Sequence, residues 1–67
     1  MSVARITEIT ATSDKSFDDA IAAGIKRAAK TLNNITAAWV KDQQVEVRKG
    51  KISQYRVCLK VTFVLED

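Results

Sequence analysis

The chain has no histidine, no proline, only two glycines and a single cysteine, Cys58, among its 67 residues. Without histidine it lacks the side chain used most often in general acid–base catalysis, and without histidine or a cysteine pair it cannot build a structural zinc site. Two glycines are too few for a phosphate-binding loop. The acidic residues are not paired as catalytic carboxylates are. These absences predict a protein that is not an enzyme.

Long apolar runs and a concentration of one charge are also missing. No apolar stretch approaches the roughly 20 residues that span a bilayer, so no membrane contact is expected. One unpaired cysteine and no export signal indicate a cytoplasmic protein. The net charge of +3 comes from eleven basic and eight acidic residues that are scattered along the chain. Nucleic-acid binders usually gather positive charge into a stripe, so no nucleic-acid partner is expected.

The segment from Ile52 to Asp67 alternates between two faces without a break, which is typical of one long β-strand with a single buried face. At about 3.3 Å per residue it would run roughly 40 to 50 Å. A single small domain over residues 1–67 cannot cover a strand of that length, so we expect the chain to form oligomers. The expected buried face consists of Tyr55, Val57, Leu59, Val61, Phe63 and Leu65.

A helix is predicted to begin after Ser16, which is a good N-cap, with Asp19 completing a capping box. Asn33 and Asn34 are expected to end it, because asparagine tolerates the left-handed conformation. Gly24 lies on the apolar side of this helix, which we interpret as a point of close approach to the sheet. The apolar stripe consists of Phe17, Ile21, Gly24, Ile25, Ala28 and Leu32.

Two further strands are predicted, from Val3 to Thr10 and from Ile35 to Arg48. Lys49-Gly50 would then form a type I′ hairpin turn into the long strand. The order β-α-β-β predicts an α+β fold, a single domain with a three-stranded antiparallel sheet wrapped on one helix. The second strand is expected to add Ala38 and Val40 to the helix-covered face.

The opposite sheet face would carry Ala37, Trp39 and Lys41 from the second strand, with Arg56, Cys58 and Lys60 from the third. No helix in the chain can cover it, so water or other subunits must do so. Trp39 has two interpretations: an aromatic residue buried between subunits, or a platform on which a planar ligand stacks beside Arg56. The spacing alone favours the subunit contact.

Nearly the whole chain resembles the dodecins, small bacterial and archaeal proteins of β-α-β-β order that assemble as hollow homododecamers and typically bind flavins. The resemblance rests on the order and spacing of several segments together. These are Thr12-Ser13 before Ser16-Phe17, Ala28-Ala29-Lys30-Thr31-Leu32, Val40-Lys41-Asp42-Gln43, Tyr55-Arg56-Val57 and Lys60-Val61-Thr62-Phe63-Val64-Leu65.

The resemblance implies a homododecamer that binds or stores a small ligand, with FMN or riboflavin as the family's usual cofactor. The family's stacking tryptophan corresponds to Ala37 here, and Trp39 follows two residues later. A glutamine that hydrogen-bonds the flavin ring corresponds to Arg56, while Asp42 matches an acidic residue near the ribityl chain. The implied site is therefore Ala37, Trp39, Asp42 and Arg56. The alternatives are a purely structural assembly, or a shell that binds an anion, a nucleotide or calcium.

Overall fold

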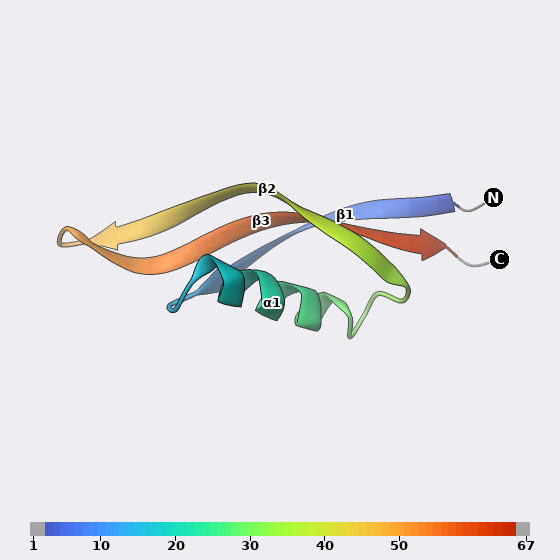
Figure 1. Ribbon diagram of the computed structural model, residues 1–67, viewed down its shortest axis with the longest axis horizontal. Helices are drawn as coiled ribbons and strands as arrows, with labels where there is room; N and C mark the ends of the chain where they lie inside the picture. The colour runs from blue at the N-terminus through green and yellow to red at the C-terminus, as the bar shows by residue number, and fades with distance from the viewer. Residues whose placement is uncertain (1–2, 66–67) are drawn as a thin grey trace.

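The computed structural model describes residues 3–65, which form one helix and three strands in a single antiparallel sheet (Figure 1). The elements are β1 (Val3–Ser13), α1 (Phe17–Ala28), β2 (Ile35–Arg48) and β3 (Lys51–Leu65). This confirms the predicted α+β class and the β-α-β-β order. Residues 66 and 67, which the sequence assigned to the last strand, lie outside the described residues.

The long strand β3 lies at the centre of the sheet, in the order β1-β3-β2. From Tyr55 onward, the odd-numbered side chains of β3 face the helix. The backbone of β3 pairs with β1 along one edge and with β2 along the other. Val57, Leu59 and Val61 are almost fully buried, as predicted, whereas Tyr55 and Phe63 are only partly buried and Leu65, also predicted to be buried, is 42% exposed. The molecule measures 51 Å along its longest axis, which matches the length expected for β3.

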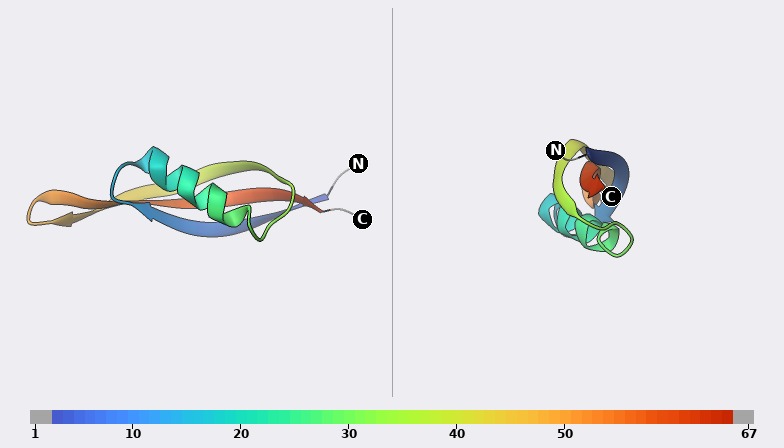
Figure 2. Two further views of the ribbon diagram at one scale, coloured as in Figure 1. Left: turned by 90° about the horizontal axis from the view of Figure 1, so that it is seen from below. Right: turned by 90° about the vertical axis from the view of Figure 1, so that its right-hand side faces the viewer.

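The helix packs over β1 and β3 and covers only part of the sheet (Figure 2). A β-carbon placed on Gly24 would lie 3.0 Å from the Ala11 Cβ and 3.3 Å from the Leu59 Cδ1. Such distances are shorter than normal carbon–carbon contact. The predicted close approach of helix and sheet at Gly24 is therefore confirmed.

The prediction that Ala38 and Val40 lie on the helix side of the sheet is confirmed, but the helix does not bury them. Both residues are on the helix side of the sheet, since they pair with Val61 and Leu59. Both are nevertheless exposed, Val40 by 39%. A helix of twelve residues is about 18 Å long, and it lies over β1 and β3. It leaves most of β2 uncovered, and only Ile35, at the start of the strand, packs against the core.

The ends of the helix follow the sequence prediction only in part. Ser16 is the N-cap, and its hydroxyl accepts a hydrogen bond from the Asp19 amide at 2.9 Å. The Asp19 carboxylate does not complete the capping box, however, because it accepts a 2.6 Å hydrogen bond from the Ser13 hydroxyl. At the other end α1 stops at Ala28, earlier than predicted, and Asn34 has the expected left-handed conformation with φ 62°.

The connection between β2 and β3 is the predicted tight turn. Lys49 and Gly50 both have positive φ, 52° and 76°, as a type I′ turn requires. Strand β1 runs three residues beyond its predicted end, because Ala11, Thr12 and Ser13 continue to pair with β3.

Candidate functional site

The sheet face turned away from α1, called the outer face below, carries all four residues that the sequence assigned to a ligand site. Along β2 these are Ala37, Trp39 and Asp42, and the fourth is Arg56 on β3. The pairing register places Ala37 opposite Thr62, Trp39 opposite Lys60, Asp42 opposite Cys58 and Gln44 opposite Arg56. Paired residues of antiparallel strands point to the same face.

A β-bulge in β2 makes this arrangement possible. The register shifts by one residue between Val40 and Asp42, so Lys41 is the extra residue. Before the bulge the odd-numbered residue Trp39 points to the outer face, and after it the even-numbered Asp42 does. Bulges of this kind redirect side chains. The sequence prediction placed Trp39 and Asp42 in one site without identifying the bulge that allows it.

The four residues are not gathered at one point of a single subunit. Each cross-strand pair on the outer face forms one row across the sheet. Starting from the row of Ala37, the next row contains Trp39, the third contains Asp42 and the fourth contains Arg56. The partner of Ala37 is Thr62, which lies six positions along β3 from Arg56, a distance of about 20 Å. Ala37 and Arg56 of one subunit are therefore too far apart to contact the same small ring.

Trp39 is the large aromatic residue of the outer face, and 46% of it is exposed. The Lys60 ammonium lies 5.7 Å from the centre of the indole ring, within the range of a cation–π contact. Because β2 is an edge strand and no helix covers this face, the indole is open to a ligand or to another subunit.

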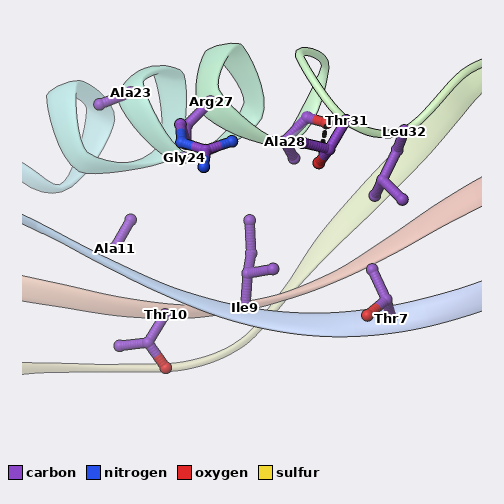
Figure 3. Close-up of a pocket in the computed structure, with 10 residues that line it drawn as sticks. All are labelled: Thr7, Ile9, Thr10, Ala11, Ala23, Gly24, Arg27, Ala28, Thr31 and Leu32. Carbon is purple, nitrogen blue, oxygen red and sulfur yellow. Dashed lines mark hydrogen bonds between the residues drawn. The ribbon is translucent and has the colours of Figure 1, made fainter.

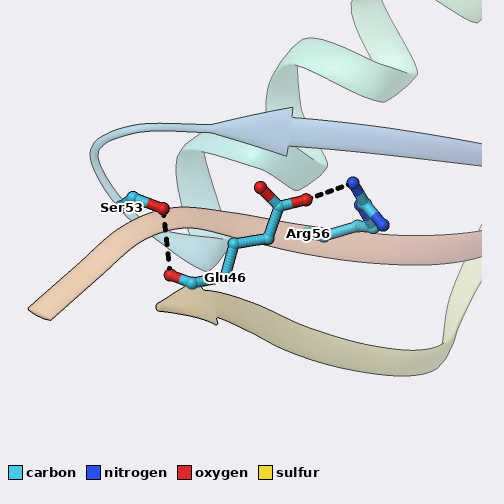
Figure 4. Close-up of polar contacts among 3 residues, drawn as sticks. All are labelled: Glu46, Ser53 and Arg56. Atoms are coloured by element: carbon cyan, nitrogen blue, oxygen red, sulfur yellow. Dashed lines mark hydrogen bonds and ion pairs between the residues drawn. The ribbon is translucent and has the colours of Figure 1, made fainter. Parts of the chain in front are cut away.

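Two ion pairs hold other charges on the same face. The Lys41 ammonium lies 3.1 Å from Oε1 of Glu8 on β1, so the pair reaches across β3. The hydrogen bond to Glu8 and its negative charge raise the pKa of Lys41. Arg56 donates to Oε1 of Glu46 (Figure 4). Sequence reasoning missed Glu8 and Glu46, although an alternation continued past the bulge would have put Glu46 on this face.

Cys58 lies at the centre of the outer face, between Thr10 of β1 and Asp42 of β2. It is a free, partly buried thiol. Among residues 3–65, no three histidine, cysteine or acidic side chains gather in a metal-binding group. The helix of the described region is too short and too polar to cross a bilayer.

The helix side of the sheet has a groove of its own, between α1 and the edge strand β1 (Figure 3). Ile9 and Ala11 point from β1 toward the helix, which approaches both of them closely at Gly24. Arg27 and Thr31 lie at its rim, and the Thr31 hydroxyl donates to the Ala28 carbonyl oxygen. None of the four sequence-predicted site residues borders this groove.

Comparison with known proteins identifies the family. The family model described as Dodecin matches residues 3–66. The chain belongs to the dodecin family. Solved dodecin structures agree with this result. The dodecin from Streptomyces davaonensis is 35% identical, with 98% of this chain and 97% of that chain covered and a TM-score of 0.93. An arginine-to-alanine mutant of the Thermus thermophilus dodecin is 31% identical, with both chains fully covered and a TM-score of 0.94.

A third dodecin differs in its stated ligand. The calcium dodecin of Mycobacterium tuberculosis, described as a calcium-chelating immunodominant antigen with a novel calcium-binding site, is 35% identical. It covers 97% of this chain and 93% of its own length with a TM-score of 0.83. A search among curated proteins finds no match. Family membership makes this chain a small ligand-binding protein of the dodecin type.

Proposed function

We propose that the chain is the subunit of a homododecameric shell that binds or stores a small planar ligand between the outer faces of two copies. The observation that carries this proposal is the open outer face itself, on which Trp39 is half exposed and no helix of the described chain provides cover. The number twelve comes from the dodecin family.

The register supports a site shared between two copies. Ala37 and Arg56 correspond to the two ring-contacting residues of flavin-binding dodecins, and within one subunit they lie about 20 Å apart along the strand. A single flavin can contact both positions only if they come from different subunits. Symmetric assemblies bring one patch against its own copy, which is how such a pair can meet.

Flavin, as FMN or riboflavin, is the ligand class that dodecin membership supports. The native affinity is expected to be weak. Ala37 has no aromatic plane, and stacking on an aromatic side chain is worth roughly 1–3 kcal/mol in nucleic-acid complexes. Arg56 has only donors, whereas the glutamine of flavin-binding relatives offers a donor and an acceptor. Arg56 is also engaged by Glu46.

Substituting Ala37→Trp together with Arg56→Gln tests the proposal. The double variant should bind riboflavin at least about tenfold more tightly than the wild type, because it regains both the aromatic plane and the acceptor. Quenching of riboflavin fluorescence during titration measures both affinities. Ala22→Trp, on the exposed surface of the helix, is the matched control and should leave riboflavin affinity unchanged.

The two riboflavin affinities can be compared only if the double variant forms an assembly of the wild-type size. Gel filtration measures that size. A shell of unchanged size that never quenches riboflavin would contradict the flavin site. In that case the chain is a structural assembly, or it takes a ligand of another class such as an anion, a nucleotide or calcium.

A further inference from the structure

The charges at the centre of the outer face are balanced in number but not all are paired. Between Ala37 and Glu46 the face carries three acidic residues, Glu8, Asp42 and Glu46, and three basic residues, Lys41, Arg56 and Lys60. Glu8 pairs with Lys41, and Glu46 pairs with Arg56. Among residues 3–65, these ion pairs leave Lys60 without a carboxylate within 4.0 Å.

The pairing of Glu8 makes the position of Lys60 notable. Glu8 is the direct cross-strand neighbour of Lys60 on β1, and its carboxylate nevertheless reaches past Lys60 to Lys41. The Lys60 ammonium lies over the Trp39 ring instead, 5.7 Å from its centre. Within residues 3–65, a positive charge with no carboxylate within 4.0 Å thus lies directly beside a half-exposed aromatic plane.

The neighbours of this pair leave room for a ring. The next row along the sheet consists of Ala37, Thr62 and, on β1 at the far side, Ile6; the two positions nearest the indole, Ala37 and Thr62, have small side chains. On that side the nearest outer-face positions of β2 and β3 therefore carry no large side chain. The ammonium of Lys60 is carried on a flexible four-carbon stem, so it can leave the indole and follow a negative group nearby.

We infer that Trp39 and Lys60 form a half-site for a planar aromatic anion, with the ring stacked on the indole and its negative group paired with the Lys60 ammonium. The inference rests on the proposed function and names the charge of the ligand. It assigns stacking to Trp39 rather than to the Ala37 position, and it gives Lys60 the role of selecting anionic over neutral ligands.

Asp42 limits how strongly the half-site attracts an anion. Its carboxylate is one row beyond Lys60 on the outer face, and within the described chain no basic group pairs with it. Because like charges repel, Asp42→Asn should strengthen binding of an anionic ligand about two- to threefold.

The experiment compares FMN with riboflavin, which share one ring system and differ in a phosphate. In low salt the wild type should bind FMN about three- to tenfold more tightly than riboflavin, as fluorescence quenching reports. Lys60→Gln should bring the ratio close to one with little change for riboflavin. Lys26→Gln removes the same charge from the exposed surface of the helix and should leave the ratio unchanged. Trp39→Ala should weaken both ligands together.

Equal affinities for FMN and riboflavin in the wild type would overturn the inference. So would an FMN preference that survives Lys60→Gln, or one that Lys26→Gln abolishes equally, since long-range attraction would then explain it. A wild type that binds neither ligand also overturns it. The proposed function is judged separately, by riboflavin binding to the Ala37→Trp, Arg56→Gln shell.

Discussion

At Gly24 the helix backbone lies against the sheet with no side chain between them. Ala11 of β1 and Leu59 of β3 border this point, and neither can move far. The Ala11 Cβ is fixed to its strand, and Leu59 is 1% exposed. The absence of a side chain at residue 24 therefore sets the distance between helix and sheet.

Gly24→Val should destabilise the subunit by about 2 kcal/mol or more, because its methyl groups must push the helix away from the core. Helix propensity cannot cause the loss, since valine is the better helix former of the two. Thermal or urea unfolding of the assembled protein measures the effect. Ala22→Val on the exposed helix surface is the control and should cost less than about 1 kcal/mol. Equal losses at the two positions would contradict the close approach.

Ser13 ties the end of β1 to the start of α1. Its hydroxyl donates to the Asp19 carboxylate at 2.6 Å and accepts from the Lys15 amide at 2.9 Å. Ser13 is 9% exposed, so these bonds satisfy a polar group that would otherwise be buried without partners. The sequence indicated the cap at Ser16, but the partner of Asp19 depends on where β1 ends.

The conformation of the β2–β3 turn depends mainly on its own two residues, Lys49 and Gly50. The turn places Lys49 at φ 52° and Gly50 at φ 76°. A left-handed conformation costs a residue with a β-carbon roughly 1–2 kcal/mol. Asparagine adopts it more readily than lysine does, and Asn-Gly is the favoured pair in a type I′ turn.

Lys49→Asn should therefore stabilise the protein by a few tenths of a kcal/mol up to about 1 kcal/mol. Gly50→Ala should destabilise it by about 1 kcal/mol. No atom lies within 4 Å of a β-carbon at Gly50, so the loss reports backbone strain alone. Chemical denaturation of both variants measures the change in the free energy of unfolding, which should rise for Lys49→Asn and fall for Gly50→Ala. If Gly50→Ala were neutral, the turn would not need positive φ at that residue.

As a whole molecule, the subunit leaves much apolar surface exposed. The hairpin arm extends beyond the start of the helix (Figure 1), and there Val47 is 60% and Ile52 53% exposed. The two residues are cross-strand partners near the hairpin turn. Adjacent exposed apolar side chains of this kind indicate a surface that another subunit covers.

Gel filtration at micromolar concentration should show a wild-type species near twelve times the 7.4 kDa subunit. Ile52→Glu should remove this species, because a carboxylate would be desolvated in the subunit contact without a partner. Lys51→Glu, one residue away on an exposed side chain, is the control for added negative charge and should assemble. A wild-type monomer would contradict the assembly, and a dodecamer of Ile52→Glu would show that the hairpin arm is not a contact.

The sequence predicted the elements of this fold well because its signals are local. The alternation of β3, the Ser16 cap and the Lys49-Gly50 turn each depend on neighbouring residues. The exposure of Val40 and the Arg56–Glu46 pair depend instead on where the helix lies and on a bulge that no sequence pattern marks. The sequence prediction assigned Arg56 a ligand as its partner, whereas the register shift at Lys41 brings Glu46 to its side.

The central position of β3 has a consequence for folding during synthesis on the ribosome. The segments that form β1 and β2 are synthesised before β3. They do not pair with each other in the sheet, because each pairs only with β3. The tight turn favours rapid pairing of β2 with β3, because closing a short loop loses little conformational entropy. We expect strand β1 to join last, because Val3 and its partner Leu65 are separated by nearly the whole chain. Until β3 has been made, the segments of β1 and β2 have no partner strand, so the sheet cannot form.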